Sequence, residues 1–176
     1  MSAKSRLQKQ LVSARDYSLS LLADFKSPEQ WVHQVHAHAN HALWFAGHMA
    51  MADNFFLSNV APEKVVVRPE FEKAFGTGSQ PTNNPADYPS AEEVLAVMKE
   101  RRETLLGVLE GMGEADLEQP LPKARADFLP DVGSVFEMAV WHEGLHSGQL
   151  SVARRAMGHA PMDQQSKTDA ARKNDE

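Results

Sequence analysis

The sequence predicts an all-α protein folded as a four-helix bundle. Four long segments carry apolar residues at three- and four-residue steps, which is the spacing that lines one face of an α-helix. No segment shows the strict two-residue alternation of a half-buried strand. The connections between the segments are long and rich in proline or polar residues, and two of them are expected to cross the length of the bundle.

The first helix is expected over residues 5–25, followed by a short helical turn. Ser27 is a suitable N-cap, Pro28 suits the first helical position, and Gln30 stands where a capping box needs it. Residues 33–41 then carry four of the eight histidines. The apolar stripe of the first helix comprises Leu7, Leu11, Ala14, Leu21 and Phe25.

The second helix is expected over residues 40–60, and His48 shares its apolar stripe. A histidine at such a position is predicted to point into the protein. The following residues, 62–89, contain five prolines and two glycines and show no helical periodicity. Loops of this length inside a compact domain are uncommon and often functional. The stripe of the second helix comprises Trp44, Phe45, His48, Met51, Ala52 and Phe55.

The third helix is expected over residues 90–111, where Ser90 and two glutamates mark its start. The fourth is expected over residues 131–157 and ends before a glycine. Residues 1–160 are therefore predicted to form one domain, and the polar residues 161–176 a disordered tail. The third stripe comprises Val94, Met98, Leu105, Leu109 and Met112, and the fourth comprises Val132, Val135, Phe136, Ala139, His142, His146, Leu150, Ala153 and Met157.

Composition excludes several classes of function. The chain has 176 residues, a formal net charge of −6 and no run of Lys or Arg, which argues against binding to nucleic acid. The absence of cysteine excludes disulfides, thiolate nucleophiles and cysteine-ligated metals. The start of the chain lacks the apolar core of a signal peptide, and no stretch is apolar enough to span a membrane. We therefore expect a soluble, cytoplasmic protein.

His142 and His146 are the most informative residues of the chain. They lie four positions apart on the inward stripe of the fourth helix, so their side chains project from the same face. Burying two imidazoles costs roughly 1–3 kcal/mol each unless each finds a partner, and one metal ion would serve both. His48 is the candidate third ligand, because a catalytic zinc-type site needs three protein ligands and an open position. Alternatively, His48 is a buried structural residue that binds nothing.

Residues 142–146 also match the short H-E-x-x-H pattern of metalloproteases. The extended pattern requires glycine and histidine at the positions that Gln149 and Val152 occupy here. A glutamate ligand further along a helix is missing as well, because the next glutamate is Glu176. We therefore reject a protease. Glu143 is offset by about 100° from the histidine before it, which predicts a surface residue or, alternatively, a general base.

Several aromatic residues and histidines have supporting or neutral roles. Trp44 and Trp141 are predicted to pack beside the candidate ligands as apolar walls that exclude water. His159 follows the last helix and is expected at the surface. The four histidines before the second helix alternate with small residues and are expected to be solvated rather than ligands; they are His33, His36, His38 and His41.

Two passages of the chain resemble the DinB-like superfamily. Residues 40–50 look like its Trp-x-x-Gly-His turn of helix, and residues 142–150 look like its His-x-x-x-His-x-Gly-Gln ending. The resemblance covers roughly residues 5–160. In that family a histidine near the middle of the second helix and the later pair bind one divalent metal, which implies that His48 joins the pair as a ligand. It also implies an up-up-down-down bundle that is often a homodimer.

The resemblance further implies a metal-dependent enzyme with a small-molecule substrate. Characterised relatives include S-transferases that join a low-molecular-weight thiol, such as bacillithiol or mycothiol, to an electrophile. Zinc or nickel is the expected metal, and iron or manganese are alternatives. Three functions stay open: a thiol S-transferase, a metal-dependent hydrolase that activates water, and a metal-binding or structural protein without catalysis. The family name refers to DNA-damage induction and does not imply binding to nucleic acid.

Overall fold

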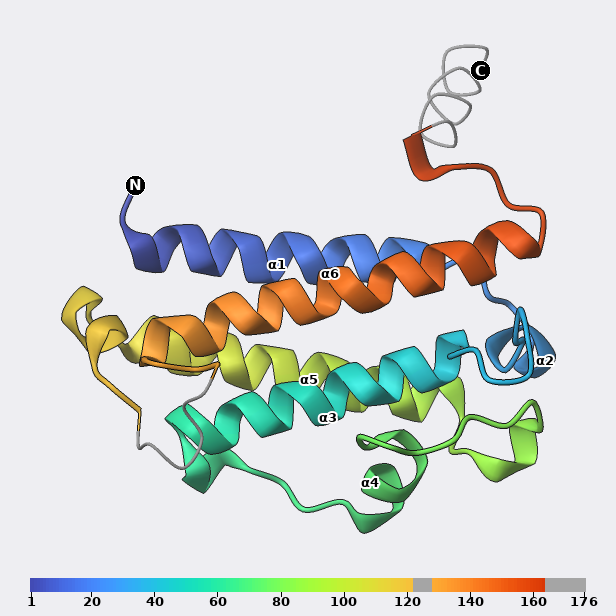
Figure 1. Cartoon of the computed structure of the whole chain (residues 1–176), viewed down its shortest axis with the longest axis horizontal. Helices are drawn as coiled ribbons and strands as arrows, with labels where there is room; N and C mark the ends of the chain where they lie inside the picture. Colours follow the sequence, from blue (N-terminus) through green and yellow to red (C-terminus); the bar gives the residue numbers. More distant parts are fainter. Residues whose placement is uncertain (122–127, 164–176) are drawn as a thin grey trace.

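Four long helices run side by side along the molecule in the computed structural model, which describes residues 1–121 and 128–163 (Figure 1). They are α1 (Ala3–Leu22), α3 (Ala42–Val60), α5 (Ala91–Gly111) and α6 (Val132–Ala156). The predicted all-α four-helix bundle is confirmed, and the only extended pairing among the described residues is one isolated bridge between Pro120 and Asp131. The shorter helices are α2 (Pro28–Trp31), η1 (Pro62–Lys64), α4 (Pro69–Phe75), η2 (Pro85–Asp87) and η3 (Glu114–Glu118).

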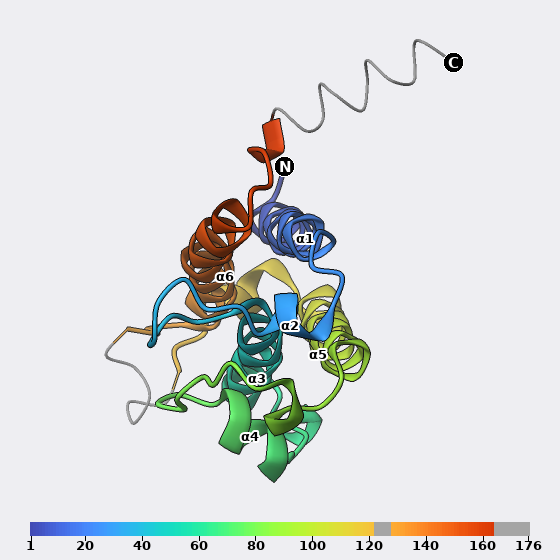
Figure 2. The same ribbon diagram turned by 90° about the vertical axis from the view of Figure 1, so that its right-hand side faces the viewer.

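Seen from one end, α1, α6, α3 and α5 surround the core, and α4 lies outside α3 (Figure 2). Within the described part of the chain, no helix combines the length and the apolar character that crossing a bilayer requires. The predicted disordered tail falls mostly on residues 164–176, which lie outside the described residues.

The directions of the four helices differ from the predicted order. The Lys4 Nζ donates to the carbonyl oxygen of Glu110 at 2.7 Å, so the start of α1 lies beside the end of α5. An ion pair between Arg154 and Asp24 joins the ends of α6 and α1. The helices therefore run up, down, down and up along the chain, and not up-up-down-down as the resemblance implied (Figure 1).

Side-chain burial in the connections explains this order. Residues 23–41 stay at one end of the bundle, because three of their apolar side chains are buried there, so α3 starts where α1 ends. Residues 112–121 and 128–131 likewise lie at the other end, where Leu117 and Leu129 are buried. Only residues 61–90 return along the bundle, which makes one crossover and not two. The buried side chains of the first connection are Phe25, Trp31 and Val32.

The helix starts follow the predicted capping signals. Ser27 accepts a hydrogen bond from the backbone of Gln30 within a capping box, as expected. Ser90 caps α5 as predicted, by accepting from the backbone N–H of Glu93, and Asp131, which was not predicted as a cap, caps α6 within a capping box. Each cap satisfies a backbone N–H that has no partner inside its helix.

His41 caps α3, contrary to the prediction that it is solvated. Its Nδ1 accepts a hydrogen bond from the backbone N–H of Trp44 at 3.0 Å. The ring is 1% exposed and packs edge-on against Tyr88, with 5.1 Å between ring centroids. The crossover thus covers the start of α3, which the local sequence could not reveal. The other three histidines of this group are exposed as predicted: His33, His36 and His38.

A layer of four buried charges divides the core into two apolar clusters. Each long helix contributes one residue: Arg15 from α1, Asp53 from α3, Arg102 from α5 and Glu143 from α6. Both arginines pair with both acids, at N–O distances from 2.7 to 3.0 Å. The guanidinium groups also donate to carbonyl oxygens of neighbouring helices. The layer is neutral as a whole and connects all four helices.

Glu143 is therefore neither the surface residue nor the free general base that the sequence suggested. It is 0% exposed, so the prediction of a surface residue is wrong. The offset of about 100° from His142 turns its carboxylate away from the histidine face and into the charged layer. Burial lowers the pKa of Arg102, but the charges of Asp53 and Glu143 outweigh this effect and raise the pKa above its usual value. The carboxylate is thus committed to charge pairing inside the bundle.

Replacing Glu143 by glutamine is expected to lower the free energy of unfolding by about 3–5 kcal/mol. The neutral amide leaves two buried arginines facing only one carboxylate, and an unpaired buried charge is costly. Urea unfolding followed by circular dichroism measures the change.

The matched control is Glu137→Gln, at an exposed position of the same helix. We expect it to change the free energy of unfolding by at most about 0.5 kcal/mol. Equal, small effects of the two variants would show that the charged layer does not hold the bundle together.

The cap at His41 predicts a loss of stability in mild acid. Burial lowers the pKa of His41 to about 4, against 6.5 for the free side chain. Protonation therefore favours the unfolded chain, because the imidazolium has no acceptor left for the Trp44 N–H. This contribution is complete above pH 6.5 and disappears as the pH falls towards 4, and it amounts to about 3 kcal/mol.

His41→Asn keeps a capping acceptor that does not titrate in this range. Urea unfolding at several pH values should show the wild type losing stability more steeply than this variant between pH 6.5 and 4. Parallel curves for the two proteins would contradict the assignment of a neutral, capping His41.

Candidate metal centre

The structure brings His48, His142 and His146 together between α3 and α6. Each offers one ring nitrogen to the cluster, and these three atoms lie within 4.8 Å of one another. The ring centroids are 4.6 to 5.1 Å apart. No other group of three or more metal-ligating side chains is found among the described residues. The sequence thus predicted the meeting of all three histidines, across a separation of almost a hundred residues.

His48 is held on two sides by residues of its own helix and of α4. Its Nδ1 donates to the carbonyl oxygen of Phe75 at 2.8 Å, because a carbonyl only accepts. The proton on Nδ1 leaves the lone pair of Nε2 free for another partner. Trp44 stacks on the ring with 4.3 Å between centroids and donates its indole N–H to Ser79. The prediction that Trp44 packs beside the site is confirmed.

Gly47 makes the contact between α4 and His48 possible. A Cβ at this position would lie 2.2 Å from Cγ of Phe75, far inside van der Waals contact. The missing side chain lets the Phe75 ring pack against α3 and brings its carbonyl oxygen to the histidine. This pairing of α3 with the crossover is not visible in the local sequence.

His146 is oriented in the same manner by a polar residue one turn along α6. Its Nδ1 lies 3.0 Å from Oε1 of Gln149, which also accepts from Nδ2 of Asn40 at 3.1 Å. An amide oxygen only accepts, so Nδ1 carries the proton and Nε2 keeps its lone pair. Sequence analysis assigned no role to Gln149, although its spacing of three residues from His146 places both on one helix face.

The three histidines are neutral at neutral pH. Burial lowers the pKa of His48 and of His146, with opposing effects of their hydrogen-bond partners. Burial and the two neighbouring imidazoles lower the pKa of His142 to about 4, against a small opposing effect of Asp53. Neutral imidazoles have the lone pairs that a metal needs.

The residues present fit one divalent transition metal. His48 and His146 each direct a lone pair away from the hydrogen bond that holds the ring. The Nδ1 of His142 is buried without a hydrogen-bond partner in the described part of the chain. Buried polar atoms without partners are rare, and a ligand from outside the protein would remove the cost. The cluster could therefore bind a metal ion.

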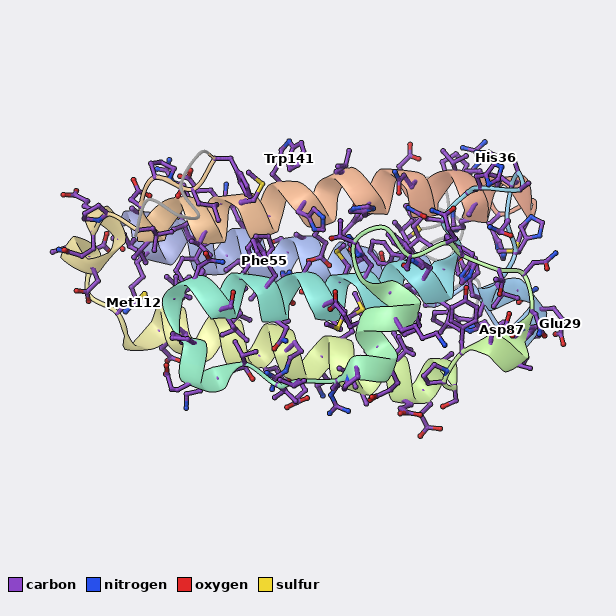
Figure 3. All side chains as sticks on the ribbon, turned by 60° about the horizontal axis from the view of Figure 1, so that its bottom comes forward. Glu29, His36, Phe55, Asp87, Met112 and Trp141 are labelled. Atoms are coloured by element: carbon purple, nitrogen blue, oxygen red, sulfur yellow. The ribbon has the colours of Figure 1, made fainter. Side chains whose placement is uncertain are left out.

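A cavity of about 690 Å³ opens beside the cluster, with His48 and His142 in its wall. Two large aromatic side chains line the cavity and, being partly exposed, mark its mouth: Phe55 on α3 and Trp141 on α6, both labelled in Figure 3. They are 45% and 60% exposed, so neither belongs to the core. Trp141, predicted to form an apolar wall beside the ligands, lines this cavity together with His142.

Comparison with known protein families gives a match over most of the chain. The family model described as DinB superfamily matches residues 10–150, a span that includes most of the four-helix bundle and all three clustered histidines. Comparison with the curated proteins gives no match.

Gln149→Leu is expected to weaken zinc binding by about tenfold, the lower end of the range for residues that orient metal ligands. Leucine keeps the size of the side chain but cannot accept from His146, so the ring loses its fixed tautomer. Competition with a zinc chelator at pH 7.5 measures the affinity.

Gln149→Glu keeps the acceptor and should retain the wild-type affinity or exceed it. Gln10→Leu, at an exposed position of α1, is the matched control and should leave the affinity unchanged. Equal affinities of the leucine and glutamate variants at position 149 would show that the contact does not orient His146.

Proposed function

The chain belongs to the DinB superfamily, and from this membership and its three-histidine cluster we propose that it is a metal-dependent enzyme acting on a small molecule. The observation that carries the proposal is the convergence of three neutral imidazoles, two of which, His48 and His142, line a cavity. Three nitrogen ligands and an open position are typical of catalytic sites, whereas structural zinc sites have four protein ligands.

His48, His142 and His146 would hold one divalent ion, with zinc or nickel suited best to imidazole nitrogen. When bound, the ion would stabilise the anion of a thiol or of water and lower its pKa. The stacked ring of Trp44 shields one side of the cluster from solvent. The cavity on the side of His48 and His142 leaves room for a substrate.

We propose transfer of a low-molecular-weight thiol as the reaction, in keeping with the resemblance described above. The thiol sulfur would form a bond to a carbon of the electrophile, the leaving group would depart with its bonding electrons, and the thiol proton would be released. The buried ion pairs of Glu143 support this choice, because the carboxylate beside the ligands is not free to act as a base for water. A thiol, with a pKa near 8.5, needs far less help than water to lose its proton.

Metal analysis tests the first half of the proposal. The purified protein should bind zinc or nickel at one equivalent per chain, and His146→Ala should lower the affinity at least about a hundredfold, because it removes a ligand directly. His36→Ala, an exposed histidine outside the cluster, should bind like the wild type. One equivalent of metal bound with unchanged affinity by His146→Ala would refute the three-histidine site.

Turnover assays test the second half. The metal-loaded protein should conjugate a low-molecular-weight thiol to a model electrophile, and a chelator should abolish the reaction. Hydrolysis of a model ester without thiol conjugation would favour the hydrolase. Metal binding without either activity would favour a metal-binding protein that does not catalyse.

A further inference from the structure

The cavity beside the histidines reaches only one side of the cluster. His48 and His142 line it, and His146 does not. The ring of His146 faces Gln149 and Asn40 at another part of the surface. A compound in the cavity would therefore approach the cluster from the side of His48 and His142.

The walls of the cavity are mainly apolar. They come from the second half of α3, from α6, from the crossover between α3 and α5 and from Phe128 ahead of α6. The aromatic rings at the mouth remain exposed to solvent, and large exposed apolar groups beside a cavity are typical of binding sites. The apolar wall residues include Met51, Ala52, Phe55, Phe56, Met138 and Trp141.

Two of the polar side chains in the wall are committed to the protein itself. The Asn54 amide donates to the carbonyl oxygen of Val66 at 2.9 Å and accepts from its N–H at 3.0 Å. The Ser58 hydroxyl donates to the carbonyl oxygen of Phe55 at 2.7 Å. These groups hold the wall in place and are not directed at a ligand.

The charge of the wall excludes one class of ligand. Glu72 is the only charged side chain that lines the cavity, and neither lysine nor arginine does so among the described residues. Without a bound metal, a carboxylate or phosphate on the ligand would face this negative charge, and no described residue of the wall offers a cation to balance it. An anion is therefore disfavoured, and the cavity suits an uncharged compound.

We propose that the cavity binds an uncharged small molecule with an aromatic or extended apolar group. A volume of about 690 Å³ accommodates one drug-sized molecule. The assignment of this compound as the electrophile of the transfer rests on the proposed function, whereas its binding does not. The polar thiol is not complementary to these walls and would reach the cluster by another side.

Three naphthalene derivatives of similar size test the proposal: 1-naphthalenemethanol, 1-naphthoate and 1-naphthylmethylamine. Binding is measured by ligand fluorescence in the presence of a chelator, so that the carboxylate cannot bind to a metal. We expect the alcohol to bind at least about tenfold more tightly than the carboxylate, and the amine to bind no more weakly than the carboxylate. Equal binding of the alcohol and the carboxylate would overturn the proposal.

Two variants locate the binding site. Ala52→Trp fills the cavity and should weaken binding of the alcohol at least about tenfold. Phe55→Ala changes a half-exposed position that folding tolerates, and it should weaken binding about fivefold. Tyr17→Ala removes an equally exposed aromatic side chain outside the cavity and should have no effect. Unchanged binding by Phe55→Ala, with circular dichroism showing a folded protein, would place the compound elsewhere.

His146→Ala separates the two proposals. We expect it to lose the metal and to keep its affinity for the alcohol within about twofold, because His146 does not line the cavity. If the wild type binds the alcohol but no metal, the proposed function fails and the binding site stands. If it binds metal but not the alcohol, the binding site fails and the metal centre stands.

Discussion

The buried layer of four charges fixes the relative positions of the four helices, and the metal centre depends on it. Charges of this kind tolerate few alternative arrangements, because any sliding of one helix leaves a carboxylate or guanidinium without its partner. Asp53 lies five residues beyond His48 on α3, and Glu143 directly follows His142 on α6. A shift of α3 against α6 by one turn, about 5.4 Å, would break the ion pairs and separate the histidines together. An apolar core could accept such a shift by repacking.

The charged layer and the histidine cluster are chemically complementary. The two arginines and two acids balance one another, so the layer adds no net charge to its surroundings. The histidines beside it stay neutral because burial lowers their pKa values. Of the four charged groups, Asp53 raises the pKa of His142 only slightly against the effect of burial. The protein thus combines a rigid ionic centre with neutral ligands, and a bound cation would keep its full charge for polarising a substrate.

Local patterns predicted the four long helices, the caps at Ser27 and Ser90 and the meeting of the histidines, but not α4. These features depend on residues a few positions apart, and the stripe position of His48 indicated that it faces the interior. The directions of the helices could not be predicted, because the length of a connection does not reveal whether its side chains are buried at one end. Arg15 and Arg102 were the readable traces of the charged layer, since Arg15 continues the four-residue steps of Leu7 and Leu11 and Arg102 lies between Met98 and Leu105 on the stripe of the third helix. Their pairing with acids on two other helices leaves no local pattern.

Apolar periodicity alone could not separate core from binding wall on α3. The predicted stripe includes Met51, Ala52 and Phe55, which line the cavity and are not part of the buried core. Both a core and an apolar ligand site avoid charged residues, so their sequence patterns coincide.

In the structure, contacts with the crossover hold parts of α3, and the second half of the helix lines the cavity. The crossover holds His48 through the carbonyl oxygen of Phe75, and its Val66 also pairs with Asn54 further along α3. The part of α3 that lines the cavity begins at His48 and reaches Ser58, so the histidine lies between the contact with α4 and the wall of the pocket. This position gives one residue both the fixed orientation that a metal ligand needs and the access that a substrate needs.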